Sequence, residues 1–95
     1  MHEVALMRAL VVRVLELAQG QQAVHVERVV VRMGALGHGR PSHLQWHFSQ
    51  AAAATLADGA VLDVVMTDEL VDLVLESIDL ELPPSPVHEV RAQQR

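Results

Sequence analysis

The sequence predicts an α+β fold in which two helices pack on one face of a three-stranded, mainly antiparallel sheet. Two stretches have the apolar spacing of helices, each is followed by a stretch of alternating, valine-rich residues, and glycines or turn residues separate them. The predicted order over residues 1–82 is helix, strand, helix, strand, strand. Residues 83–95 are rich in Pro, Gln and Arg and are expected to form a disordered tail.

Both predicted helices are amphipathic. Residues 3–19 carry apolar side chains at every third or fourth position, and Gly20 is expected to end this helix. The second helix is predicted to begin at Pro41, a favoured first helical residue, and to end at Asp58-Gly59. The first apolar stripe is Leu6, Leu10, Val14 and Leu17, widened by Met7, Val11 and Ala18, and the second is Leu44, Phe48, Ala51 and Thr55.

The predicted strands occupy residues 24–33, residues 60–66 and about residues 70–82. Thr67-Asp68-Glu69 is expected to form a tight connection between the last two. In the last strand the apolar positions change phase near Leu75-Glu76, which predicts a β-bulge. In the first strand, Val29, Val31 and Met33 are predicted on the covered face, and Arg28, Val30 and Arg32 on the open face.

Composition restricts the classes of function. The chain has no cysteine, which excludes disulfides, zinc ribbons and thiolate chemistry. Residues 41–90 contain nine acids and no Arg or Lys, which argues against nucleic-acid binding. This acidic half is interpreted as a solvated sheet face, with a docking surface for a basic partner as the alternative. We expect a cytoplasmic protein without a membrane span or signal peptide, and a binding protein rather than an enzyme, because no nucleophile elbow or phosphate-binding glycine motif occurs.

The first three residues, Met1-His2-Glu3, are the sharpest candidate site. A free terminal amine, a backbone amide and the His2 imidazole can close fused five- and six-membered chelate rings around one ion. Planar nitrogen coordination of this kind suits Ni(II) or Cu(II). A histidine after the first methionine is more often a solvated terminus, so the motif by itself is weak evidence.

The other histidines carry weaker signals. His43 and His47 are four residues apart on the predicted second helix, a spacing at which two imidazoles can share an ion. Since no third ligand is obvious, the alternative is that they are ordinary surface or core-edge residues, with His38 just upstream. His25 is expected to be exposed at a strand start, and His88-Glu89 is interpreted as a coincidental repeat of the first residues.

Five segments carry a family resemblance that covers residues 1–82: MHEVALMRAL, VERVVVRMGAL, RPSHLQWHF, TLADGAVLDV and ELVDLVLESIDLE. Together they resemble the HypA family of hydrogenase nickel-incorporation factors and its paralogue HybF. The resemblance implies a metallochaperone that passes Ni(II) to the large subunit of nickel-iron hydrogenase or its precursor, with a maturation GTPase, and in some organisms acts with urease maturation. By position, it implies nickel ligands at Met1 (amine), His2 (imidazole and amide) and Glu3 (amide, with its carboxylate in support).

The sequence departs from the family in two places. The family normally inserts a four-cysteine zinc ribbon where this chain has only Thr67-Asp68-Glu69, so no zinc is expected. Arg40 stands where the family usually has a carboxylate near the nickel site, and a guanidinium there would repel a cation. Both departures favour an alternative function: an interaction or assembly module, or structural subunit, docked on a hydrogenase-related complex. An unpaired sheet edge would also permit a homodimer.

Overall fold

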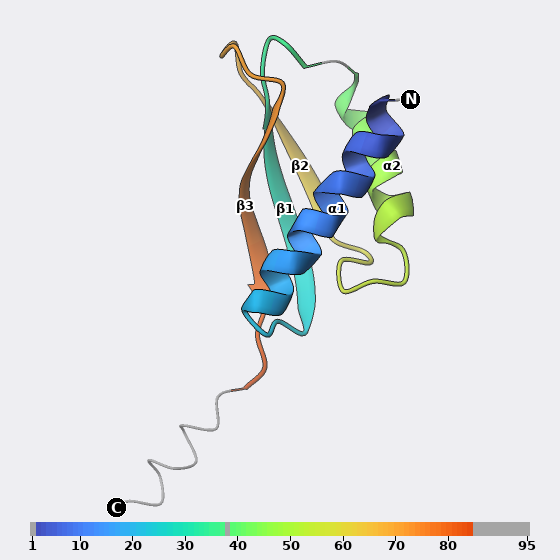
Figure 1. Cartoon of the computed structure of the whole chain (residues 1–95), viewed down its shortest axis with the longest axis vertical. Helices are drawn as coiled ribbons and strands as arrows, with labels where there is room; N and C mark the ends of the chain where they lie inside the picture. The colour runs from blue at the N-terminus through green and yellow to red at the C-terminus, as the bar shows by residue number, and fades with distance from the viewer. Residues whose placement is uncertain (1, 38, 85–95) are drawn as a thin grey trace, which may run out of the picture.

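The computed structural model describes residues 2–37 and 39–84 (Figure 1). The elements follow the predicted order: α1 (His2–Gly20), β1 (His25–Met33), α2 (Pro41–Ala52), β2 (Val61–Met66) and β3 (Leu73–Glu81). Both helices cover one face of the sheet, and they begin side by side at the same end of the molecule (Figure 1). The predicted α+β architecture is therefore confirmed. All but the first two residues of the expected disordered tail lie outside the described residues.

The sheet is mixed rather than mainly antiparallel. Its order is β2-β1-β3, with β1 parallel to β2 and antiparallel to β3. The connection through α2 returns the chain to the end of the sheet where β1 began, so β1 and β2 must run in the same direction. The expected tight connection from β2 to β3 is also wrong. β3 pairs on the far side of β1, and residues 67–72 carry the chain past the end of that central strand.

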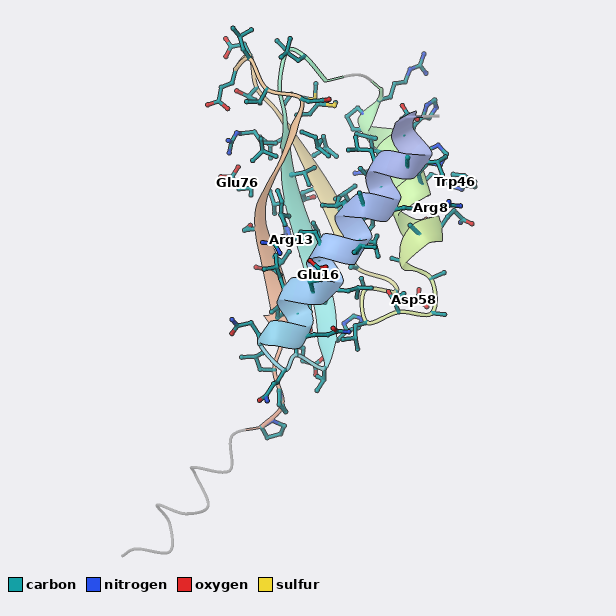
Figure 2. The ribbon with its side chains drawn as sticks, in the orientation of Figure 1. Arg8, Arg13, Glu16, Trp46, Asp58 and Glu76 are labelled. Carbon is teal, nitrogen blue, oxygen red and sulfur yellow. The ribbon has the colours of Figure 1, made fainter. Side chains whose placement is uncertain are left out.

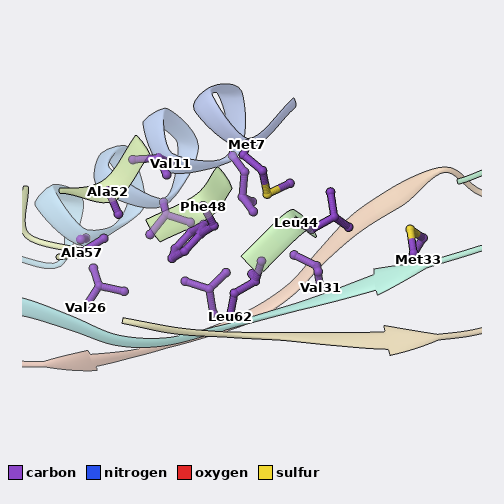
Figure 3. Packing of buried hydrophobic residues seen from close by; sticks show 14 residues of the cluster. Met7, Val11, Val26, Val31, Met33, Leu44, Phe48, Ala52, Ala57 and Leu62 are labelled. Carbon is purple, nitrogen blue, oxygen red and sulfur yellow. The ribbon is translucent and has the colours of Figure 1, made fainter. Parts of the chain in front are cut away.

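The core lies between the helices and the sheet, around Phe48 (Figure 3). The covered face of β1 is the predicted one. The buried side of α1 is the predicted one and includes the widening residues Met7, Val11 and Ala18, whereas Leu6 and Leu17 lie half-buried at its margin. The buried apolar residues are Met7, Leu10, Val11, Val14, Ala18, Val26, Val29, Val31, Met33, Leu44, Phe48, Ala52, Ala57 and Leu62.

Helix α2 ends at Ala52, earlier than the predicted end at Asp58-Gly59. Ala53 adopts an extended backbone (φ −57°, ψ 136°) and Ala54 has a φ of +64°. The Asp58 carboxylate accepts a hydrogen bond of 3.1 Å from the Ala54 N–H and so closes a turn. This turn directs the buried Ala57 and the start of β2 towards the core, and tertiary packing overrides the helix propensity of the alanines.

Two irregularities shape the pairing of β1 with β3. The register shifts between Val30 and Val31, which leaves Glu76 as an extra residue of β3 and confirms the predicted bulge. A second shift, between Val26 and Arg28, leaves Glu27 as an extra residue of β1. No pattern in the sequence had indicated the second bulge.

Candidate metal centre

The first residues of α1 lie beside the start of α2. Helix α1 begins at His2, and Met1 is outside the described residues. The first four N–H groups of a helix have no intrahelical acceptor, so the amides of His2 and Glu3 take no part in the hydrogen-bond ladder. The fold thus leaves available the backbone nitrogens that the predicted chelate requires.

The Glu3 carboxylate lies between α2 and the loop that precedes it. Glu3 Oε1 is 3.5 Å from His47 Nε2, and each side chain is about a quarter exposed, 26% and 25% respectively. The contact is an ion pair only when the imidazole is protonated. Gly39 has a φ of +102°, and a Cβ at this position would collide with Glu3 Oε2. Glycine therefore satisfies both the backbone conformation and the space that the carboxylate needs.

Both predicted histidines lie on α2, but their surroundings differ. His47 contacts Glu3, whereas His43 is exposed. The Trp46 and His47 rings meet edge to face, with centroids 5.2 Å apart and an interplanar angle of 76°. Trp46 is itself exposed, near the start of α1 (Figure 2). Within residues 2–37 and 39–84, the side chains placed to hold one ion together do not include Glu3, His43 or His47, so metal binding by the two histidines stays a prediction.

Arg40 occupies the N-cap position of α2. Its backbone is extended (φ −107°, ψ 143°), its side chain makes no capping hydrogen bond, and the residue is exposed. It directly follows Gly39, whose backbone packs against the Glu3 carboxylate. The positive charge that departs from the family pattern is therefore carried on the loop that encloses the candidate site. His38 and His88-Glu89 lie outside the described residues.

The loop before α2 is tied to the β2–β3 connection. The Gly34 N–H donates to the Asp72 carbonyl (3.0 Å), and the Ala35 N–H donates to the Glu69 carbonyl (2.8 Å). A Cβ at Gly34 would come within 2.5 Å of the Glu69 carbonyl oxygen, so only glycine permits this approach. The β2–β3 connection, at which the resemblance implies an inserted zinc ribbon, is thus in direct contact with the start of the loop that leads to the candidate nickel site.

Ion pairs cross the open face of the sheet. Arg28 pairs with Asp63 of β2. Arg32 donates from Nε to Glu69 (2.8 Å) and from Nη1 to Glu76 (2.6 Å). The hydrogen bond to Glu76, followed by that to Glu69, raises the pKa of Arg32. Arginines of the first half of the chain thus neutralise acids of the second half, which supports the interpretation as a solvated sheet face.

A second cluster, formed by His25, Glu27 and Glu81, lies at the other end of the sheet. One ring nitrogen and one oxygen from each carboxylate lie within 4.8 Å of one another. His25 is half-buried rather than exposed, and its Nε2 is 3.0 Å from the Asp58 carbonyl oxygen. Sequence reasoning missed this cluster. The alternation of His25 and Glu27 along a strand indicated that their side chains share a face. The pairing of β1 with β3, which adds Glu81, could not be predicted from the sequence.

The family assignment rests on residues 1–76, which match a sequence model described as "Hydrogenase/urease nickel incorporation, metallochaperone, hypA". The chain belongs to the HypA family. It is 36% identical to "Hydrogenase maturation factor HypA" of Methylocella silvestris over 64 residues, 67% of this chain and 57% of that protein. It is 41% identical to the HypA protein of Archaeoglobus fulgidus over 64 residues, 67% of this chain and 58% of that protein. The match therefore spans less than two thirds of the length of these HypA relatives.

The fold is also that of a HypA protein. The chain is similar to "Solution structure of the Ni metallochaperone HypA from Helicobacter pylori", with a TM-score of 0.72 and 18% identity over 85% of this chain and 98% of that one. At this identity the likeness shows the fold alone. No helix among the described residues of this HypA-family chain is long and apolar enough to cross a membrane.

Proposed function

We propose that this HypA-family chain binds one Ni(II) ion at its N-terminus and acts as a metallochaperone-like maturation factor for nickel-iron hydrogenase. The ligands are the Met1 amine, the amide and imidazole of His2, and the amide of Glu3. The observation that carries the proposal is the start of α1 at His2, which leaves these amides outside the helical ladder and beside the Glu3–His47 contact. The family description, nickel incorporation and metallochaperone, supports the same assignment.

The surroundings of this site fit its chemistry. Amide nitrogens bind Ni(II) after losing their protons, and the resulting negative charge is favoured at the positive N-terminal end of a helix. The Glu3 carboxylate, held against Gly39 and His47, adds negative charge close to the ion. Because binding releases protons, nickel affinity is expected to increase with pH.

Nickel titration of the untagged protein tests this proposal. Calorimetry should show one tight Ni(II) site per chain. Trp46 is the single tryptophan and touches His47, so binding should also change its fluorescence. His2→Ala, or an extension before Met1, should abolish tight binding, whereas the exposed control Gln19→Ala, at the other end of α1, should leave it unchanged. Equal affinity of the wild type and His2→Ala would refute the N-terminal site.

A second candidate function is an interaction module that does not deliver nickel. Within the described part of the chain, β2 pairs only with β1, and its outer edge carries exposed Val61, Val65 and Met66. An apolar edge of this kind can accept a strand from a partner or from a second copy of the chain. The positive charge of Arg40, which follows Gly39, also favours the interaction module, because a guanidinium near the candidate nickel site would repel a cation.

Arg40→Glu separates the two functions. If Arg40 only weakens a working nickel site, the variant should bind Ni(II) more tightly and should transfer it more efficiently to an apo-hydrogenase precursor. A stoichiometric complex with a hydrogenase-related partner that forms equally well without nickel, and that Arg40→Glu does not affect, would favour the interaction module.

A further inference from the structure

We propose that His25, Glu27 and Glu81 form a second metal site, which binds a divalent transition-metal ion independently of the N-terminus. The cluster lies where β1 begins and β3 ends, at the end of the sheet away from the start of α1 (Figure 1). Its three donor atoms lie within 4.8 Å of one another. An ion that binds ligands at about 2.0–2.2 Å could join them after small rotations of the two exposed glutamates.

Strand pairing brings the three side chains together on the open face of the sheet. His25 is the register partner of Glu81 across the antiparallel pair, and such partners share a face. Glu27 is two residues further along β1 and points the same way, because the intervening Val26 is fully buried towards the helices. Glu27 is also the extra residue of the β1 irregularity, and bulges commonly re-aim a side chain.

A group outside the cluster holds one ring nitrogen of His25. Its Nε2 is 3.0 Å from the Asp58 carbonyl oxygen, which can only accept a hydrogen bond. Nε2 therefore carries the proton, and the lone pair of the neutral ring is on Nδ1. A carbonyl behind an imidazole is the usual outer partner of a metal-binding histidine, since it fixes the ring and raises its basicity. The Asp58 turn is itself fixed by the hydrogen bond from Ala54.

The local charges favour a cation. Arg28, which follows Glu27, pairs with Asp63, and no ion pair within residues 2–37 and 39–84 neutralises Glu27 or Glu81. Two converging carboxylates repel each other, and a bound ion relieves that repulsion. One imidazole and two carboxylates suit Zn(II) or Ni(II), whereas Mg(II) prefers oxygen ligands throughout.

The two sites are too far apart to share an ion. Helix α1 has 19 residues and separates the N-terminus from the turn that leads to His25, a span of about 28 Å. Removing one site should therefore leave the other intact.

The test uses the full chain with His2→Ala as background, which removes the proposed N-terminal site. Calorimetric titration with Zn(II) and with Ni(II) should still show one ion per chain, bound more weakly than the Ni(II) ion at the N-terminus of the wild type, and Mg(II) at the same concentrations should not bind. Adding Glu27→Gln with Glu81→Gln, which keeps the side-chain shapes, should weaken binding at least ~10-fold. The matched control Asp79→Asn removes a charge from the same strand but no ligand, and should change affinity by less than about twofold.

Three results would overturn the second site: no Zn(II) or Ni(II) binding in the His2→Ala background, undiminished binding after both glutamine substitutions, or an equal loss in Asp79→Asn and Glu81→Gln. The last would mean that the acidic surface attracts ions without a defined site. His25→Ala also removes the bond to Asp58, so the glutamine variants carry the test and circular dichroism confirms their folding. Failure of the N-terminal site appears separately, in the comparison of the wild type with His2→Ala.

Discussion

Gly39 is the residue at which a single methyl group should most disturb the candidate nickel site. Gly39→Ala places a Cβ in a backbone conformation of φ +102° and against the Glu3 carboxylate. We expect it to lower the free energy of unfolding by roughly 1–2 kcal/mol, from backbone strain, because the end of the flexible Glu3 side chain can move aside. Urea denaturation measures this loss, and nickel titration should show weaker binding in the same variant.

Gly59→Ala is the matched control for Gly39→Ala. Gly59 also has a positive φ (+81°), but a Cβ added to it would meet no atom within 4 Å. It should show the backbone cost alone, about 1–2 kcal/mol, with unchanged nickel affinity. An equal effect on nickel affinity in the two variants would mean that the contact between Gly39 and Glu3 has no role.

Ala54 offers the opposite change, a substitution that should stabilise the protein. It is a non-glycine residue with a φ of +64°, so Ala54→Gly relieves left-handed strain. We expect the free energy of unfolding to rise by about 0.5–1 kcal/mol in a urea titration. The neighbouring Ala53→Gly has no positive φ to relieve and should destabilise the protein. A loss of stability in Ala54→Gly would show that the turn after α2 is not strained.

At the scale of the elements, local sequence patterns correctly predicted features that neighbouring residues determine, such as a bulge and the start of a helix. The phase change at Leu75-Glu76 identified a true bulge, and Pro41 marked the first residue of α2. The end of α2 was wrong because the alanines that follow favour a helix, while burial of Ala57 and the bond from Ala54 to Asp58 require a turn. The expected tight connection between the last two strands was also wrong, because β3 pairs with β1 and that choice of partner does not depend on local sequence.

The candidate site likewise has one part that adjacent residues predict and other parts that depend on tertiary packing. Met1-His2-Glu3 could be selected from the sequence because its chelating groups are adjacent along the chain. The contact between Glu3 and His47 could not, because it depends on how α1 and α2 pack. The cluster with Glu81 was missed since it requires both the β1–β3 register and an irregularity at Glu27.

The ion pairs of Arg32 with Glu69 and Glu76 should stabilise the fold equally at all pH values near neutrality. Arg32 has a raised pKa when folded, so its contribution is fully present below the ordinary arginine pKa and is lost only at a higher pH. Arg32→Gln should therefore lower the urea midpoint by the same amount at pH 6 and pH 9. Arg13→Gln, which breaks an exposed pair with Glu16 on α1, should have little effect at either pH. A pH-dependent loss in Arg32→Gln would contradict this account.

On the scale of the whole molecule, β1 is the strand on which the fold depends. It lies between β2 and β3 and supplies the buried Val26 and Val31, both labelled in Figure 3. Its amides should exchange with solvent only on global unfolding. The β2 amides that point away from β1 have no partner among the described residues, and should exchange faster by a factor of about 100 or more. Hydrogen exchange followed by NMR measures both sets.

Hydrogen exchange measured at several protein concentrations tests whether a second copy of the chain covers the edge of β2. If the isolated chain is a monomer, the rapid exchange of the outward β2 amides should not depend on protein concentration. Slow exchange that becomes rapid on dilution would mean that a second copy adds a strand there, as the exposed Val61 and Val65 would permit. Amides of α1 and α2 serve as internal controls, because their hydrogen bonds lie within each helix and a partner at the β2 edge should not change them.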